Sequence, residues 1–143
     1  MNRAKIALVT LAAAAAVPIA MAAPASAATS SRCTVTPLKP IFAGFNSSGV
    51  KLVDYRISVS CASNCTVQIE QRRYEEDAWP NPDDFLGASS FSTYGVRTLS
   101  NVRTLVNTES GNEEVYQKVR FRVTINGHTL PWTSWEKSPV ASI

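Results

Sequence analysis

The sequence contains one stretch whose residue types could do chemistry, RRYEEDAWPNPDD, which runs from Arg72 to Asp84. It holds five carboxylates, two prolines and one tryptophan, Trp79. Irregular loops of carboxylate and carbonyl oxygens bind calcium, and paired carboxylates hydrolyse glycosidic bonds. Four of the carboxylates could converge on one site if the prolines fold the segment back on itself, namely Glu76, Asp77, Asp83 and Asp84.

A plainer interpretation is that this stretch is a solvated crossover between two β-sheets. The calcium-loop pattern D-x-[DN]-x-[DN]-G is absent, and neighbouring carboxylates such as Asp83 and Asp84 diverge. In a crossover, Arg72 and Arg73 offset part of the negative charge, and Trp79 covers the end of the core. We favour the crossover and expect no metal ion or other cofactor, while a cation loop and a glycosidase-like pair stay open as alternatives.

A second candidate site is a stripe of positive charge, in which Lys118, Arg120 and Arg122 occupy alternate positions of a predicted strand. Residues two apart on a strand share a face, and Trp135 lies across from Lys118 if the following hairpin extends that far. A cationic stripe beside an aromatic ring binds anionic glycans, cell-wall polymers or acidic proteins. We favour a merely solvated outer face, since outward charges are ordinary on antiparallel sheets, and a binding stripe stays open as the alternative. We take these four residues, together with Trp79, as the candidate binding residues.

Catalysis has little support in the sequence. The chain has one histidine, His128, and neither the G-x-S-x-G nor the H-E-x-x-H pattern occurs. His128 follows a predicted turn, where we expect an exposed side chain. We therefore expect no catalytic residue.

The chain has three cysteines, Cys33, Cys61 and Cys65, and strand alternation places all three on core-facing positions. Cysteines of exported proteins usually pair, and an odd number leaves one over. We predict a Cys61–Cys65 disulfide, because the hairpin described next places these residues directly opposite each other. The alternative Cys33–Cys61 disulfide closes a longer loop, worth about 3.6 kcal/mol in the loop-entropy model against about 2 kcal/mol for the short loop.

Two segments of alternating polarity frame this cysteine pair. Apolar residues occupy the odd positions of 53–61 and resume at Cys65, a period of two that is typical of strands with one buried face. Asn64 ends the connection and tolerates the left-handed conformation that a three-residue hairpin loop requires. The sequence therefore predicts a hairpin whose second strand runs to about Arg73. The predicted pairs are Cys61 with Cys65, Val59 with Val67, and Ile57 with Ile69.

A second hairpin is predicted around Asn126-Gly127, the strongest short hairpin signal in a sequence. Alternating residues over 115–125 form its first strand. Pro131 lacks an amide proton, so the second strand lies at an edge or ends there. The predicted pairs are Val123 with Leu130 and Phe121 with Trp132.

Shorter strands are expected from Cys33 to the proline at 37, over 41–45, and over 96–107 with a bulge or break. Asn46 begins a predicted turn. About seven short strands joined by turns are typical of a β-sandwich. We therefore predict an all-β fold, a single antiparallel β-sandwich of immunoglobulin-like architecture.

The first 27 residues have the features of a secretory signal peptide. A basic start is followed by an apolar run too short to span a bilayer, and Ala25-Ser26-Ala27 matches the A-x-A cleavage pattern. We predict cleavage after Ala27. We also predict export by the general secretory pathway rather than the twin-arginine pathway, because this segment holds no Arg-Arg pair. Residues 28–143 then form one secreted domain without a membrane span.

Removing the signal peptide takes two basic residues from a chain of net charge +3 and leaves 12 basic against 11 acidic residues, a net charge of +1. Binding to nucleic acid thereby loses its compositional support. We predict a small, monomeric, exported bacterial protein that acts by binding a protein, an envelope glycan or other envelope polymer, or a secreted enzyme. The alternatives are a small secreted hydrolase that uses the carboxylates of residues 75–84 and a calcium-stabilised module.

Overall fold

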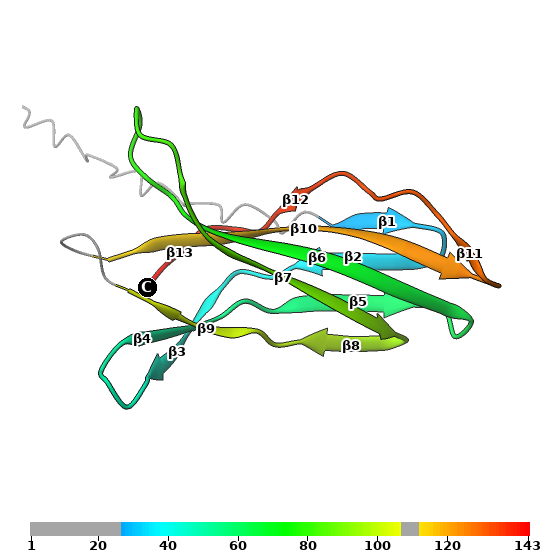
Figure 1. Cartoon of the computed structure of the whole chain (residues 1–143), viewed down its shortest axis with the longest axis horizontal. Helices are drawn as coiled ribbons and strands as arrows, with labels where there is room; N and C mark the ends of the chain where they lie inside the picture. The colour runs from blue at the N-terminus through cyan, green and yellow to red at the C-terminus, as the bar shows by residue number, and fades with distance from the viewer. Residues whose placement is uncertain (1–26, 107–111) are drawn as a thin grey trace, which may run out of the picture.

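The computed structural model of the chain describes residues 27–106 and 112–143, which form β-strands and loops but no helix (Figure 1). All strand pairings between these residues are antiparallel. The predicted all-β, antiparallel fold is therefore confirmed. The predicted signal peptide lies outside the described residues except for Ala27. Within those residues there is no helix of the length and hydrophobicity that crossing a membrane requires.

The first sheet has the strand order β1-β2-β5-β8. Its strands are β1 (Ala28–Ser30), β2 (Cys33–Pro37), β5 (Ile57–Cys61) and β8 (Val96–Leu99). Alternate residues of β2 and β5 are buried, among them Val35, Ile57 and Val59. The alternation seen in the sequence thus marks the inner face of this sheet.

The second sheet, called the long sheet below, has the order β11-β10-β6-β7, and two short strands also pair with β10. Its strands are β6 (Cys65–Glu75), β7 (Asp84–Tyr94), β10 (Glu114–Ile125), β11 (His128–Thr129), β12 (Glu136–Lys137) and β13 (Ala141–Ser142). β6 and β10 pair without a break from Cys65 opposite Ile125 to Glu75 opposite Val115. This uninterrupted pairing gives the long sheet a regular outer face.

The third sheet has the order β3-β4-β9 and lies at one end of the molecule (Figure 1). Its strands are β3 (Ile41–Phe45), β4 (Lys51–Asp54) and β9 (Val102–Leu105). The predicted turn after β3 is present, because the Asn46 Oδ1 accepts hydrogen bonds of 2.9 Å from the amides of Ser48 and Val50. The predicted break after Val96 is also confirmed, since it separates β8 from β9. The antiparallel sheets include a curled half-barrel, and the described residues form 13 strands, more than the seven or so that we predicted.

The predicted hairpin between residues 57–61 and 65–73 is wrong. Both strands exist, but β5 pairs with β2 and β8, whereas β6 pairs with β10 and β7. The connection through Ala62 carries the chain from one sheet to the other, and the two strands face each other across the core. Alternation reveals which face of a strand is buried but not which strand is its hydrogen-bonded neighbour, so both arrangements have the same sequence pattern.

The predicted Cys61–Cys65 disulfide is also wrong, because it depended on that hairpin. The disulfide joins Cys33 to Cys61, which lie directly opposite each other on β2 and β5 with their Cα atoms 4.1 Å apart. Cys65 lies on β6 in the other sheet and is a buried free thiol. All three cysteines do face the core, as the alternation predicts.

The interior has two apolar parts separated by buried amides. The larger cluster lies between the first sheet and the long sheet and includes Ile57, Val67 and Phe121, and the smaller one surrounds Tyr55 and Leu105. Between them lie fully buried polar side chains, with Gln71 and Gln117 both 0% exposed. A buried amide costs free energy unless it is hydrogen-bonded, and these amides are bonded.

The amide network joins two strands of the long sheet to the segments that connect the first and third sheets. The Nε2 of Gln71 donates to the Oε1 of Gln117 at 2.5 Å and to the carbonyl oxygen of Tyr55 at 3.1 Å. The Nε2 of Gln117 donates to the carbonyl oxygens of Leu38 and Arg56 at 2.8 and 2.7 Å. These carbonyls belong to the segments where the chain leaves one sheet for another, so the network fixes the crossing points.

Candidate binding surface on the long sheet

The outer face of the long sheet carries the charges that the core excludes. On β10, Val119, Phe121 and Val123 point inward, so Arg120 and Arg122 point outward. Register places Arg120 opposite Glu70 and Arg122 opposite Gln68 on β6. The side chains of both strands therefore meet in rows across the face.

Two tryptophans reach this face from the segment that follows β11. The amide of Leu130 donates to the carbonyl of Val123 at 2.8 Å, which confirms the predicted Val123–Leu130 pair. The next predicted pair is wrong by one residue, because the amide of Thr133, rather than that of Trp132, donates to the carbonyl of Phe121 at 2.8 Å. Pro131 has no amide proton to give the ladder, and β11 ends before it. The shift leaves Trp132 and Trp135 beside the outward arginines.

The arginines and tryptophans interleave into a ladder in the order Arg122, Trp132, Arg120, Trp135 and Arg72. The guanidinium carbons of Arg122 and Arg120 lie 4.8 and 4.9 Å from the ring centre of Trp132. Those of Arg120 and Arg72 lie 4.8 and 4.6 Å from the ring centre of Trp135. All four distances are within the range of cation–π attraction. We call this set the arginine–tryptophan ladder.

Trp132 and Trp135 each have two guanidinium carbons 4.6–4.9 Å from the ring centre. Guanidinium groups therefore cover part of the surface of both rings. Stacking on a ring leaves the edges of a planar guanidinium group available for hydrogen bonds in its plane, although Glu70 uses one edge of Arg120 and Gln68 the Nε of Arg122. The ladder thus presents a row of fixed donor forks, with ring edges between them.

The ladder carries more positive charge than the surrounding carboxylates neutralise. Glu70 accepts hydrogen bonds of 2.7 and 2.6 Å from the Nε and Nη2 of Arg120. The Nε of Arg122 donates to the neutral amide oxygen of Gln68 at 2.7 Å. Among the described residues, no hydrogen bond or ion pair is formed by the side chains of Arg72 and Lys118. Both lie beside aromatic rings, and the charge of Lys118 also helps to lower the pKa of Asp83.

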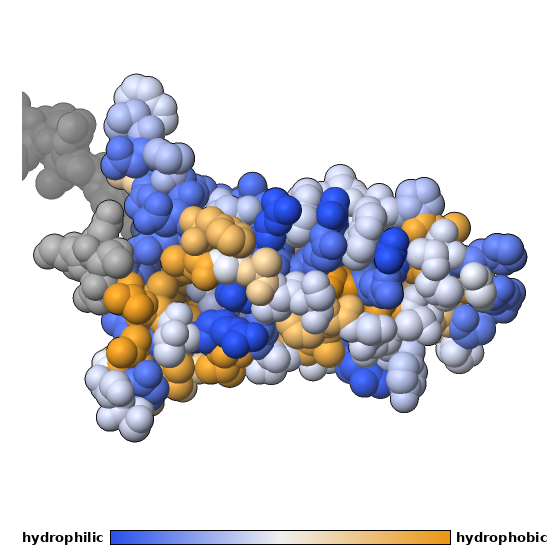
Figure 2. All heavy atoms as spheres, in the orientation of Figure 1, coloured by the Kyte–Doolittle hydropathy of each residue, from blue (hydrophilic) through white to orange (hydrophobic). Residues whose placement is uncertain are grey.

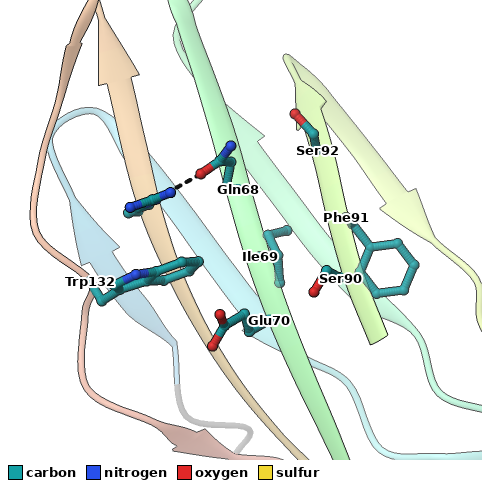
Figure 3. Close-up of a pocket in the computed structure, with 8 residues that line it drawn as sticks. Gln68, Ile69, Glu70, Ser90, Phe91, Ser92 and Trp132 are labelled. Carbon is teal, nitrogen blue, oxygen red and sulfur yellow. Dashed lines mark hydrogen bonds between the residues drawn. The ribbon is translucent and has the colours of Figure 1, made fainter. Parts of the chain in front are cut away.

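A shallow groove follows the ladder along β6 and β7 (Figure 3). It consists of two adjoining hollows of about 380 and about 280 Å³ that share Glu70 and Ser90. In Figure 3 the groove has Trp132 and Glu70 on one side and Ser90 and Ser92 of β7 on the other. One side therefore combines tryptophan rings, arginines and the carboxylate of Glu70, and the other carries the hydroxyl groups of Ser90 and Ser92 with Ala88 and Phe91.

The structure brings together part of the binding set predicted from the sequence. Arg120, Arg122 and Trp135 belong to the ladder. Trp135 does not lie across from Lys118, because the register places Lys118 opposite Lys137. Lys118 lies beside the ladder instead, with its Nζ 5.3 Å from the ring centre of Tyr74. Trp79 is 92% exposed in the acidic stretch and is no part of this surface.

The sequence interpretation missed Trp132, Arg72 and the groove. The signal was present as two tryptophans three residues apart after a hairpin turn, and as the alternation of Gln68, Glu70 and Arg72 on a strand. Pairing these residues with β10 required knowing that β6 and β10 are neighbours, which the wrong hairpin concealed.

The acidic stretch is a loop between two neighbouring strands of one sheet, so our prediction of a crossover between sheets is wrong. β6 extends to Glu75, β7 begins at Asp84, and the two strands pair directly. The connecting residues 76–83 therefore form the loop of a β-hairpin, called the acidic hairpin loop below. Trp79 lies exposed in it and does not cover the core.

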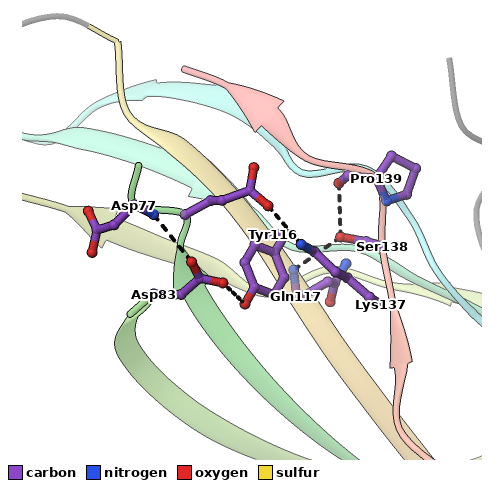
Figure 4. A network of polar contacts seen from close by, with 8 residues as sticks. Asp77, Asp83, Tyr116, Gln117, Lys137, Ser138 and Pro139 are labelled. Carbon is purple, nitrogen blue, oxygen red and sulfur yellow. Dashed lines mark hydrogen bonds and ion pairs between the residues drawn. The ribbon is translucent and has the colours of Figure 1, made fainter. Parts of the chain in front are cut away.

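Two of its carboxylates are engaged by the protein itself (Figure 4). The Oδ2 of Asp83 accepts a 2.5 Å hydrogen bond from the Tyr116 hydroxyl, and its Oδ1 accepts one of 3.3 Å from the Asp77 amide. The Oε1 of Glu76 lies 2.8 Å from the Nζ of Lys137. The hydrogen bond from Tyr116 lowers the pKa of Asp83, while burial and the Asp83 carboxylate raise the pKa of Tyr116.

The cation-loop alternative gains no support from this geometry. In residues 27–106 and 112–143, no group of three or more histidine, cysteine or acidic side chains is arranged to hold a metal ion. Asp84, the fourth candidate ligand, lies on β7 opposite Glu75 rather than in the loop. His128 is exposed at the start of β11, as predicted.

Apolar side chains are exposed at the end of the molecule that also carries the acidic hairpin loop, over the third sheet and the start of β7 (Figure 2). They include Phe42 and Phe45, whose rings pack edge to face at 5.2 Å.

No protein-family model and no curated protein sequence matches this chain. Its function must therefore be argued from its own surfaces.

Proposed function

We propose that this protein is an exported binding protein whose ligand lies along the arginine–tryptophan ladder on the outer face of the long sheet. The observation that carries the proposal is the interleaved stack of three arginines and two tryptophans beside a groove. The N-terminal sequence supports export, because residues 1–27 have the pattern of a signal peptide.

The ladder suits binding because its charged groups are held in place before a ligand arrives. A free arginine side chain loses rotamer freedom when it is immobilised at an interface, which weakens binding. Arg120 and Arg122 are already fixed by tryptophan rings and by Glu70 and Gln68. Less conformational freedom remains to be lost when a ligand contacts their edges.

We propose further that the domain works as a β-sandwich of immunoglobulin-like type, with the long sheet as its binding face. Support comes from the larger apolar cluster, to which β2 and β5 contribute from one side and β6 and β10 from the other. Such a scaffold supports the regular β6–β10 pairing from below, and the ladder depends on that register.

The test is capture from the envelope and culture fluid of the producing organism. The bait is the mature chain, compared with the double variant Arg72→Gln/Arg122→Gln. The matched control is Arg97→Gln/Arg103→Gln, which removes two exposed arginines from β8 and β9. We expect one ligand to be held by the wild type and the control but lost from the ladder variant. A ligand retained equally by all three proteins would refute the ladder as the binding surface.

The hydrolase and calcium-module proposals lead to different results. A hydrolase that uses the acidic hairpin loop would lose turnover on substitution of Glu76, Asp77, Asp83 and Asp84 while folding stays intact. A calcium-stabilised module would melt at a higher temperature with calcium than with chelator. The binding proposal expects no turnover and no calcium effect.

A further inference from the structure

We propose that the ligand is a linear acidic polymer with a hydroxyl-rich backbone, either a polysaccharide or a polyol phosphate, that bears an oxyanion at least every 10 Å or so. The inference rests on the proposed function, because it assigns the chemistry of the ligand to the same ladder and groove. Spacing, charge, partly covered ring surfaces and groove lining each bear on it.

The spacing of the arginines sets the repeat of the ligand. The guanidinium carbons of Arg120 and Arg122 lie 4.9 and 4.8 Å from the Trp132 ring centre, so they are at most 9.7 Å apart. The same reasoning through Trp135, with 4.8 and 4.6 Å, places Arg120 and Arg72 at most 9.4 Å apart. Alternate residues of one strand are about 7 Å apart. The row of donors therefore matches acidic groups that recur at about 7–10 Å.

The charge of the face selects an anion. Arg72, Lys118, Arg120 and Arg122 point outward from β6 and β10, and the facing residues of β7, which include Ser90 and Ser92, are uncharged. Glu70 is the one carboxylate that contacts the ladder among the described residues, and it offsets the charge of Arg120 alone. An anionic polymer that follows the row therefore meets unneutralised charge at both of its ends.

Guanidinium groups beside the tryptophan rings disfavour two ways of binding by stacking, that of neutral sugars and that of the bases of single-stranded nucleic acids. Two guanidinium carbons lie 4.6–4.9 Å from each ring centre, so they compete with a stacking ligand for both rings. What remains exposed is suited to oxyanions, which bind guanidinium edges through paired hydrogen bonds.

The lining of the groove favours a hydroxyl-rich backbone over a polypeptide. Protein partners are held by large apolar or aromatic anchors that fill pockets. Here Ser90 and Ser92 offer hydroxyl groups opposite the ladder, while the apolar lining residues Ile69 and Phe91 are packed with the core. The two hollows share residues and follow β6, so an extended chain can occupy both.

The experiment measures binding of the mature chain to four polymers at low and physiological salt. Polygalacturonate supplies carboxylates, poly(glycerol phosphate) supplies phosphodiesters, dextran is a neutral polysaccharide, and poly-L-glutamate is an acidic polypeptide. We expect binding to one or both acidic hydroxyl-rich polymers, weakened by salt. We expect no binding to dextran and at least about 10-fold weaker binding to poly-L-glutamate. The stronger of the first two polymers identifies the preferred oxyanion.

Three variants connect this binding to the ladder. Arg72→Gln and Arg122→Gln should each weaken binding by roughly 5- to 10-fold, and the control Arg97→Gln should leave it unchanged. Glu70→Gln should strengthen binding by roughly 3-fold or more, since it removes the carboxylate that competes with the ligand for Arg120. If the ladder had a merely structural role, the loss of the Glu70 carboxylate would instead weaken polymer binding or leave it unchanged.

Two results would overturn the inference. Dextran or poly-L-glutamate binding as tightly as the acidic hydroxyl-rich polymers would show that the ligand class is wrong. Failure of both acidic hydroxyl-rich polymers to bind would also show that the ligand class is wrong. The capture experiment then tests separately whether the ladder is the binding surface. If capture still depends on Arg72 and Arg122, the binding proposal survives with another ligand, and if it does not, both proposals fail.

Discussion

The arginine–tryptophan ladder lies on β6 and β10, and the acidic hairpin loop connects β6 to β7 and contacts Tyr116 of β10. Both regions combine cations, aromatic rings and carboxylates. In the loop, Asp83 and Glu76 are bound by Tyr116 and Lys137, so these carboxylates are occupied within the protein. In the ladder, one carboxylate faces three arginines. Composition shows which charges a segment carries, whereas strand register decides which of them remain available to a ligand.

The largest expected effect comes from removing a ring of the ladder. Trp135→Ala deletes two cation–π contacts and a half-buried side chain, and we expect it to lower the free energy of unfolding by about 2–3 kcal/mol. Trp79→Ala, in the acidic hairpin loop, should change it by less than about 0.5 kcal/mol. Urea unfolding of the two variants measures the difference. Equal effects would mean that the two regions do not differ in how firmly their aromatic rings are held.

A smaller effect is expected where the loop meets the sheet. Tyr116→Phe removes the hydroxyl that donates to Asp83, and after allowance for solvent screening we expect a loss of about 1 kcal/mol in the free energy of unfolding. Tyr94→Phe is the matched control, because Tyr94 is largely exposed and its hydroxyl has no recorded hydrogen-bond partner. An unchanged urea midpoint for Tyr116→Phe would contradict the view that the hydrogen bond from Tyr116 to the Asp83 carboxylate stabilises the protein.

The dependence of stability on pH tests the contribution of the ionised Asp83 carboxylate. The pKa of Asp83 is lowered in the folded protein, chiefly by the Tyr116 hydroxyl, from its ordinary value of 3.8. The unfolded chain therefore binds the proton more readily, so this contribution is complete above about pH 4–5 and is lost as the pH falls further. Asp83→Asn should flatten the fall of stability between pH 5 and about pH 3, while Asp84→Asn should retain it. Urea midpoints measured across this range decide the matter.

The smallest effect is expected for the ion pair at the rim of the loop. Glu76→Gln removes the charge that faces Lys137, and both side chains are partly exposed. Exposed ion pairs contribute about 0–0.5 kcal/mol, so the thermal midpoint should hardly move. A loss larger than that of Tyr116→Phe would reverse the proposed order of contacts within the loop.

Much of the fold follows from local patterns in the sequence. Alternation located the strands around Val59, Val67 and Phe121 and their buried faces, and Asn126-Gly127 located a hairpin with one correct pair. Neighbour relations did not follow, because the face that a strand buries is the same whether the next strand pairs with it or lies across the core. That ambiguity produced both the wrong hairpin and the wrong disulfide.

The candidate surface was predictable to a lesser degree. The outward direction of Arg120 and Arg122 follows from alternation on one strand. Their stacking on Trp132 and Trp135 depends on a one-residue shift after Pro131, and the position of Arg72 depends on the pairing of β6 with β10. These are long-range relations, and no local propensity encodes them.

The buried amides have a consequence for the outer face. A slip of two residues between β6 and β10 would keep every apolar side chain pointing inward, so hydrophobic burial alone tolerates it. The same slip would move Gln117 by about 7 Å along the strand, away from Gln71 and from the carbonyls of Leu38 and Arg56. Each buried amide left unpaired costs about 1–3 kcal/mol. The interior glutamines thus fix the register between β6 and β10. On the opposite side of the sheet, this register decides which outward arginine lies beside which tryptophan.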